Sequence, residues 1–171
     1  DTDWANIMEV IFTDIVTSEK YVYLTTPYFI PNDQIITALQ VASKSGVDVR
    51  LIIPKNSDSW TAKHATNSYI ECLLDADIKI YRYCKGFIHA KTIVIDDVFG
   101  TVGTTNMDYR SFEINFEINA IIYNKEKSLE LKSHFFEDLE ECELIDHERW
   151  LNRPKMEKLK ESYCRLWAPL L

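Results

Sequence analysis

Hydrophobic and polar positions follow two spacings along the chain, and the spacing changes from helical to extended several times. Near the N-terminus apolar residues recur at intervals of three and four, which predicts an amphipathic helix with Asp3 as its N-cap. Its apolar positions are Trp4, Ile7, Met8, Ile11, Phe12, Ile15 and Val16. Runs of β-branched and aromatic residues predict strands over 21–26, 47–53 and 78–83. Helices are predicted between these strands, over about 33–45 and 57–75, and Gly46 follows the earlier one as a C-terminal cap.

The second half of the chain adds two further strand-like runs, over 88–95 and 117–123, joined by a loop rich in Gly and Thr. An acidic amphipathic helix is predicted over 125–145, and a last helix over 154–167. Alternation of strands and helices predicts an α/β fold, with a mixed, mostly parallel sheet flanked by helices on both faces. We expect a single domain over 1–171, in which 146–171 is a helical tail that packs loosely or contacts something else.

Composition narrows the class of protein. The 171 residues are 46% apolar and 27% charged, which is typical of a globular domain, and 27 acidic against 19 basic residues give a net charge of −8. Proteins that coat nucleic acid neutralise its phosphates with an excess of cations, so the balance disfavours that class. The four cysteines form no Cys-x-x-Cys pair, which argues against a zinc ribbon. No apolar run approaches the roughly 20 residues of a membrane span, and we expect the chain to be a piece of a longer protein.

Two basic side chains carry the first chemical signal. His89 and Lys91 are two positions apart on a predicted strand, so both side chains point to the same face. An ammonium group can hold a phosphodiester there while the imidazole attacks phosphorus or donates a proton. Phosphodiesters resist nucleophiles because they are negatively charged, and a fixed cation offsets that repulsion.

Neutral donors and a carboxylate follow at short distance in the sequence. Gly103 allows close approach of the backbone to a ligand, and Thr104 and Asn106 supply donors for phosphate oxygens. Glu117 is placed to accept the second N–H of the imidazole and to fix its tautomer. Each residue alone has an ordinary structural explanation: a core histidine, a solvated lysine, a turn, an edge-strand carboxylate. The hypothesis requires no metal and no cofactor.

Taken together, these residues fill the pattern His-x-Lys-x4-Asp-x6-Gly-[Ser/Thr]-x-Asn, which resembles the signature of the phospholipase D superfamily. The fold implied is the phospholipase D/nuclease-like sandwich. Asp96 completes the catalytic motif, and we interpret it as the member that holds the strand and the following loop in register. Glu117 matches the carboxylate that orients the histidine in that family. Thr104 stands where serine is commoner, and it keeps the hydroxyl.

The resemblance is wider than the motif. From about residue 21 to 123 the chain is similar to the C-terminal half of bacterial cardiolipin synthases, including TTPYFIPNDQIITALQ and DYRSFEINFE. It implies that Tyr28 and Phe29 border the substrate cleft. It also implies that Arg110 either contacts the ligand or forms an ion pair with Asp108.

In the phospholipase D superfamily two motifs face one cleft, where one histidine forms a phosphohistidine and the other protonates the leaving alcohol. This chain has one motif, because His64, His134 and His147 each lack a lysine two positions on. His64 is expected on a solvated helix face. The missing half-site would come from an N-terminal half of the parent enzyme or from a second copy, and the isolated chain is expected to show little or no turnover.

The function implied by the resemblance is phosphatidyl transfer between two phosphatidylglycerol molecules, with His89 as the acid. Phospholipid is then the substrate, the parent protein provides attachment to the cytoplasmic side of the cell membrane, and no nucleic acid is bound. Two alternatives stay open. One is a phosphodiesterase or nuclease that acts as a homodimer, and the other is a non-catalytic binding module.

Overall fold

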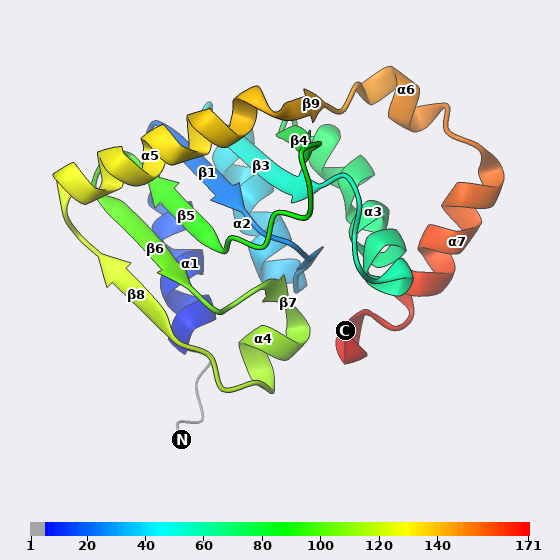
Figure 1. The fold of residues 1–171 in the computed structure, drawn as a ribbon, viewed down its shortest axis with the longest axis horizontal. Coiled ribbons are helices and arrows are strands. Elements are labelled where there is room, and N and C mark those ends of the chain that lie inside the picture. Colours follow the sequence, from blue (N-terminus) through cyan, green and yellow to red (C-terminus); the bar gives the residue numbers. More distant parts are fainter. Residues whose placement is uncertain (1–5) are drawn as a thin grey trace.

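A seven-stranded mixed sheet forms the centre of the computed structural model, which describes residues 6–171 (Figure 1). The strand order is β8-β6-β5-β1-β3-β4-β9. Its strands are β1 (Tyr21–Thr25), β3 (Asp48–Pro54), β4 (Lys79–Tyr83), β5 (Thr92–Ile95), β6 (Phe99–Gly103), β8 (Asn119–Ile122) and β9 (Cys142–Leu144). Two short strands, β2 (Phe29–Ile30) and β7 (Met107–Asp108), pair with each other in a separate ribbon.

Strand direction differs between the two halves of the sheet. β1 pairs with β3, and β3 with β4, in parallel register. The pairs β1–β5, β5–β6, β6–β8 and β4–β9 are antiparallel. The prediction of a mixed α/β sheet is therefore confirmed, whereas its mostly parallel character is wrong for the part of the chain that the structure describes. Parallel strands need long crossovers, and the chain after β4 is connected largely by tight turns and loops that reverse its direction.

Helices cover both faces of the sheet, as predicted. They are α1 (Asn6–Val16), α2 (Asp33–Lys44), α3 (Trp60–Leu74), α4 (Tyr109–Glu113), α5 (Lys125–Glu140), α6 (His147–Leu151) and α7 (Lys155–Arg165), with a final 3-10 turn, η1 (Ala168–Leu170). Strand β1 contributes side chains to both faces of the sheet. Val22 and Leu24 pack in the core under α1, α2 and α3. Tyr21 and Tyr23 point to the other face and pack with Phe135 of α5. Successive side chains of a strand alternate in direction, so the continuous run YVYLT fills both layers.

Helices α2 and α3 have side-chain caps at their N-termini. Asn32 accepts a hydrogen bond from the Ile35 N–H at 3.1 Å, and Ser59 caps α3, which begins at Trp60 instead of 57. Gly46 has φ +97°, the left-handed conformation that suits glycine after a helix. The predicted cap Asp3 lies outside the described residues. No helix within residues 6–171 combines the length and the hydrophobicity that crossing a bilayer requires.

Two elements of the second half differ from the prediction. The loop expected between the last two strands contains β6, which forms a hairpin with β5 through a turn at Asp96 and Asp97. Both residues have positive φ, 54° and 60°. The acidic helix ends at Glu140, and residues 142–144 form the edge strand β9 rather than a further turn of helix.

The C-terminal tail is fixed to the body of the domain. Arg153 Nη1 lies 2.9 Å from Glu71 of α3, and Arg153 Nη2 lies 2.7 Å from Glu161 of α7. The Arg153 side chain is 12% exposed and that of Glu161 is 3% exposed. The Arg153 guanidinium also stacks on the Trp150 ring at 4.7 Å. The expectation of loose packing for residues 146–171 is therefore wrong, because a buried ion network joins the tail to α3.

Candidate active site

His89 and Lys91 lie in an extended segment immediately before β5, which begins at Thr92. The strand predicted over 88–95 is therefore shorter than expected, and both residues precede its ladder. Because β5 is antiparallel to β1, this segment lies beside the carboxyl ends of β1 and β3. Open α/β sheets bind ligands at the carboxyl ends of their parallel strands.

The two basic side chains are in direct contact. Lys91 Nζ donates to the His89 carbonyl at 2.8 Å, and it lies 3.1 Å from Nδ1 and 3.3 Å from Nε2 of the same residue. Burial lowers the pKa of Lys91, while Glu117 and Asp108 act in the opposite direction. A partly desolvated ammonium gains more from an anion than a fully hydrated one does. The pair therefore forms a preorganised cation next to an exposed imidazole.

Thr104 and Glu117 are brought together by the β5–β6 hairpin. The Gly103 N–H donates to the Lys91 carbonyl at 3.3 Å, so the end of β6 lies beside the start of β5. Thr104 Oγ1 donates to Glu117 Oε2, and Asn115 Nδ2 lies 3.3 Å from Glu117 Oε1. The expected hydrogen bond from His89 to Glu117 is not present among the described residues. Glu117 instead orients the Thr104 hydroxyl and supports the charge of Lys91.

Asn106 and Asp108 follow Thr104 in the chain, and Asp108 is close enough to Lys91 to act on its charge. The Asn106 side chain donates to Asp108, while its buried Oδ1 has no partner among the described residues. Asp108 is 5% exposed and caps α4 by accepting the Ser111 N–H at 2.7 Å. Burial raises the pKa of Asp108, against hydrogen bonds that lower it. No ion pair joins Asp108 to Arg110 in the described part of the chain, and the Arg110 side chain is exposed.

Aromatic rings line one side of the histidine. The Tyr28 ring lies 6.5 Å from the His89 ring in an edge arrangement, and the Phe87 ring lies 5.5 Å from it. Tyr28 donates to Asp58 Oδ1 at 2.6 Å, and burial together with this bond raises the pKa of Tyr28 to about 12. Sequence reasoning missed Phe87 and Asp58. Phe87 could have been found from its position, since it precedes His89 by two residues in an extended segment.

Two residues assigned to the site lie elsewhere. Phe29 is 1% exposed and belongs to the main core, where it pairs with Met107 between β2 and β7, so its assignment to the cleft is corrected. Asp96 lies beyond the far end of β5, separated from His89 by the whole strand. Its carboxylate accepts the backbone N–H groups of residues 19, 20 and 21 at 2.6, 2.9 and 2.8 Å. Asp96 therefore holds the hairpin to the start of β1 and does not contact the cluster.

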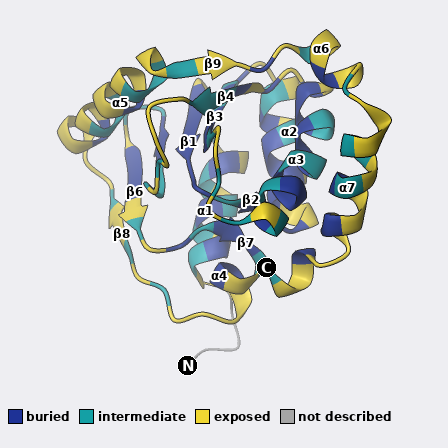
Figure 2. Cartoon of the chain, turned by 45° about the vertical axis from the view of Figure 1, so that its right-hand side comes forward, coloured by how far each residue is buried: buried dark blue, intermediate teal, exposed yellow. Residues whose placement is uncertain are grey.

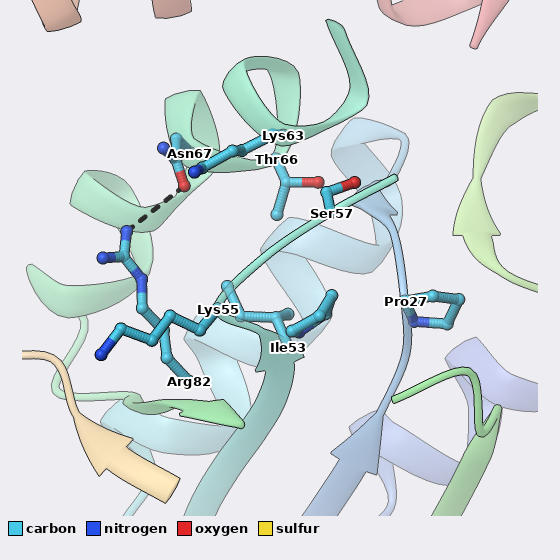
Figure 3. A pocket seen from close by; sticks show the side chains of 9 residues that line it. Pro27, Ile53, Lys55, Ser57, Lys63, Thr66, Asn67 and Arg82 are labelled. Atoms are coloured by element: carbon cyan, nitrogen blue, oxygen red, sulfur yellow. Dashed lines mark hydrogen bonds between the residues drawn. The ribbon is translucent and has the colours of Figure 1, made fainter. Parts of the chain in front are cut away.

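A second hollow lies on the same edge of the sheet, next to the loop that carries Tyr28 (Figure 3). Its cationic side chains are Lys55, Lys63 and Arg82, and Arg82 Nη2 lies 3.5 Å from Asn67 Oδ1. Lys55 is paired with Glu143 at 2.8 Å. The hollow adds positive charge to this edge in a chain that is acidic as a whole.

The remaining histidines do not join the cluster. His64 is buried, with the Trp60 ring 4.5 Å away and its Nδ1 3.9 Å from Glu157 Oε2, so the expected solvated position is wrong. His134 pairs with Glu137 at 3.2 Å, and His147 pairs with Asp75 at 3.0 Å. Within residues 6–171, no three His, Cys, Asp or Glu side chains lie close enough together to hold a metal ion.

Solved structures with the same architecture include members of the phospholipase D family. Nuc from Salmonella typhimurium superposes with a TM-score of 0.70 at 21% identity, over 81% of this chain and 90% of that one. Phosphatidylserine synthase from Haemophilus influenzae superposes with a TM-score of 0.76 at 14% identity, over 96% of this chain and 45% of that one. At these identities the likeness establishes the fold, and it confirms the predicted phospholipase D/nuclease-like architecture.

Comparison of sequences identifies the family, which the likeness of structures does not. The family model described as "Cardiolipin synthase, PLD-like domain" matches residues 11–139. Cardiolipin synthase from Geobacillus sp. (strain WCH70) is 41% identical over 171 residues, and cardiolipin synthase 2 from Bacillus anthracis is 43% identical over the same length. The chain spans about a third of these relatives, 34% and 33% of their lengths. The resemblance drawn from the motif is thereby confirmed, and the chain belongs to the cardiolipin synthase family of phospholipase D-like domains.

Proposed function

We propose that this domain supplies one half-site of a phosphatidyltransferase that joins two phosphatidylglycerol molecules into cardiolipin. The contact between Lys91 Nζ and both ring nitrogens of His89 carries the proposal. It places a preorganised cation at the atoms that would exchange a proton or a phosphoryl group. When a phosphate binds, the Thr104 hydroxyl turns from Glu117 toward it, and the Asn106 side-chain NH2 donates its second N–H to a phosphate oxygen.

The reaction proceeds in two displacements. In the first, an imidazole nitrogen bonds to phosphorus, the bond from phosphorus to the glycerol oxygen breaks, and the leaving glycerol takes a proton from a second histidine. In the second, the primary hydroxyl of another phosphatidylglycerol gives its proton back to that histidine, and its oxygen displaces the imidazole. Two phosphatidylglycerol molecules thus become one cardiolipin and one glycerol. Water in place of the second lipid would give phosphatidic acid.

His89 is assigned as the acid, and Lys91 as the group that holds the phosphate. The exposed imidazole can reach a leaving oxygen, and Tyr28 with Phe87 shields it on one side. Lys91 offsets the negative charge that repels the attacking group. Glu117 acts through Thr104 and through its field at Lys91 rather than by contact with the ring.

The histidine that attacks phosphorus comes from outside this chain. The length of the curated relatives, about three times that of this chain, favours an N-terminal half of the same parent enzyme. The chain would then be the C-terminal half, attached to the cytoplasmic side of the cell membrane through the parent. Pairing of two copies about a two-fold axis is the alternative, and it would bring two His89 side chains to one cleft.

The proposal is tested with the parent enzyme and its His89→Ala variant, incubated with phosphatidylglycerol while cardiolipin and glycerol are measured by mass spectrometry. We expect a loss of about a hundredfold to ten-thousandfold, the usual contribution of a general acid. His134→Ala is the matched control, because that ring is exposed and pairs only with Glu137. Full activity of His89→Ala would refute the assignment and favour a non-catalytic module.

A second substrate separates the two possible roles of His89. A p-nitrophenyl phosphodiester has a leaving group that departs without protonation. If His89 is the acid, His89→Ala keeps most of its activity on this ester, whereas a nucleophile's removal abolishes it. The isolated chain tests the homodimer alternative: phosphodiesterase activity that rises with the square of its concentration would support two copies, and inactivity at every concentration supports the parent's other half.

A further inference from the structure

Helix α7 packs against α3 and turns large apolar side chains toward solvent. Its inward residues Glu161 and Cys164 are 2% and 0% exposed, and Ala168 of the following turn is 3% exposed. Six large apolar residues of α7 and the turn after it are 45% to 76% exposed: Met156, Leu159, Tyr163, Leu166, Trp167 and Leu170. We call this set the α7 face. Figure 2 colours the helix by burial and shows exposed positions along α7. Apolar surface of this extent is unfavourable in water, and it marks a contact with another apolar phase.

The inward side of α7 explains why the helix is fixed in this rotation. Glu161 is held by Arg153, whose Nη2 lies 2.7 Å away, and Arg153 also binds Glu71 of α3. Turning the helix by half a revolution would bury the leucines but would carry Glu161 away from Arg153, whose side chain is 12% exposed. A buried charge that loses its partner is strongly destabilising, so the ion network holds the α7 face outward.

The α7 face forms one stripe with a basic border. Positions 156, 159, 163 and 166 recur at intervals of three and four, which at roughly 100° per residue keeps them on one side of a helix. By the same rotation Lys155 and Lys160 lie at the two borders of the stripe. Residues 146–171 contain six Lys and Arg against four Asp and Glu, in a chain whose total charge is −8. The tail thus combines a basic excess with exposed apolar and aromatic side chains.

We propose that the α7 face lies on the surface of an anionic phospholipid bilayer. Helices that lie in the interface have this composition, with apolar residues toward the acyl chains and Lys or Arg toward the headgroups. Tyr and Trp are favoured at that depth because one end of each ring is apolar and the other polar. Here Tyr163 and Trp167 are adjacent, with ring centroids 6.5 Å apart. The lysine borders are complementary in charge to negative headgroups.

The chain that follows the α7 face leads toward the cluster that contains His89 and Lys91. After α7 the chain passes through η1, and the Leu171 carbonyl accepts the Arg110 N–H at 3.4 Å. Arg110 belongs to α4, which begins directly after the buried Asp108 of the cluster. A bilayer against α7 would therefore lie beside the edge at which lipid headgroups enter. The inference goes beyond the proposed reaction, because it concerns a surface that takes no part in the chemistry.

Vesicle binding by the chain tests the proposal. Sedimentation with vesicles of phosphatidylglycerol and phosphatidylcholine is compared with vesicles of phosphatidylcholine alone, for the native chain and a Leu159→Glu, Leu166→Glu variant. Each leucine is worth about a tenfold change in partitioning, so the double variant is expected to lose at least about a hundredfold. Val41→Glu is the matched control, since Val41 is 53% exposed on helix α2. Thermal unfolding of each variant verifies that it folds.

The outcomes divide clearly. Binding that requires phosphatidylglycerol, weakens with salt, is lost in the double variant and is kept in Val41→Glu supports the proposal. Equal loss in Val41→Glu, equal binding to phosphatidylcholine, or no binding at all overturns it. Self-association of the native chain that the double variant abolishes would also overturn it, by assigning the face to a second copy. His89→Ala should bind vesicles like the native chain, so a failure of the catalytic assignment stays separate from a failure of this one.

Discussion

Asp96 joins the β5–β6 hairpin to the beginning of β1, and its replacement by alanine removes the hydrogen bonds that connect them. The carboxylate accepts three backbone N–H groups, those of Glu19 at Oδ2 and of Lys20 and Tyr21 at Oδ1. Its backbone is also in the left-handed region, with φ 54°. Aspartate and asparagine tolerate that region far better than alanine does.

The magnitude follows from these contacts. Hydrogen bonds to a charged acceptor contribute about 1.5–3 kcal/mol each when buried, and we take about 0.5–1 kcal/mol for the two exposed ones at Glu19 and Lys20. With about 1.5 kcal/mol for the part-buried bond at Tyr21 and about 1 kcal/mol for the backbone, Asp96→Ala should lower the free energy of unfolding by about 4 kcal/mol. Asp96→Asn keeps the oxygen that serves Lys20 and Tyr21, so its effect should be about 1–2 kcal/mol.

Urea unfolding followed by circular dichroism measures these differences. With a slope of about 2 kcal/mol per molar urea, Asp96→Ala should lower the midpoint by about 2 M at unchanged slope. Asp77→Ala is the matched control, because Asp77 has φ 63° but its side chain forms only an exposed ion pair with Lys44. It should lose about 1 kcal/mol, the backbone share alone.

The reasoning would be refuted if Asp96→Ala unfolded at the same midpoint as Asp77→Ala, since the three hydrogen bonds would then contribute nothing. The reasoning would also be refuted if the Asp96→Ala variant folded normally but no longer bound phosphate. The structure gives Asp96 a part in holding the fold together and none in contact with the ligand.

Two further predictions concern the cluster itself. Gly103→Ala should lower the free energy of unfolding by about 2–3 kcal/mol, because a Cβ there would lie 2.0 Å from Asn119 Oδ1 and 2.4 Å from the Ile118 carbonyl. Gly86 has open space around it, so Gly86→Ala is the control and should change the melting temperature little. Asp108→Asn should flatten the pH dependence of stability. The pKa of Asp108 is raised in the folded state, so the native chain loses stability as the pH rises from the ordinary aspartate pKa through the raised one, and asparagine removes this titration. Urea midpoints at a series of pH values measure this, and a parallel curve for the variant would contradict it.

Much of the site could be predicted because the motif coincides with a hairpin. The register pairs Thr92 with Val102, so the residues just outside the ladder, Lys91 and Gly103, must lie side by side. The hairpin thus brings together residues that the motif separates by a fixed spacing in the sequence. The hydrogen bond between Thr104 and Glu117 could not be predicted, because it depends on the path of the chain through α4 and the loop after it.

The missed elements have physical reasons as well. β6 reads FGTVG, and its two glycines are typical of a loop. It is a strand because β5 and β8 supply hydrogen bonds on both sides. At Gly100 the Leu131 side chain of α5 packs closely over the backbone, 2.7 Å from where a Cβ would lie. The helical pattern of 125–145 likewise continues through residues 142–144, where pairing with β4 prevails over propensity.

Tyr28 and Phe29 show the limit of assigning a site by adjacency. Neighbouring residues of an extended segment point in opposite directions, so a motif that borders a cleft contributes only alternate side chains to it. Tyr28 faces His89, while Phe29 faces the core. The resemblance to the family identified the segment, and the alternation of side chains decided which residue lies beside His89.

Arg153 has a consequence for how the whole domain is oriented. By binding one carboxylate on α3 and another on α7, it sets the rotation of the last helix about its own axis. The angle between the outer surface of that helix and the exposed side chain of His89 is then a constant of the fold. Whatever α7 rests against, the imidazole meets it at one inclination.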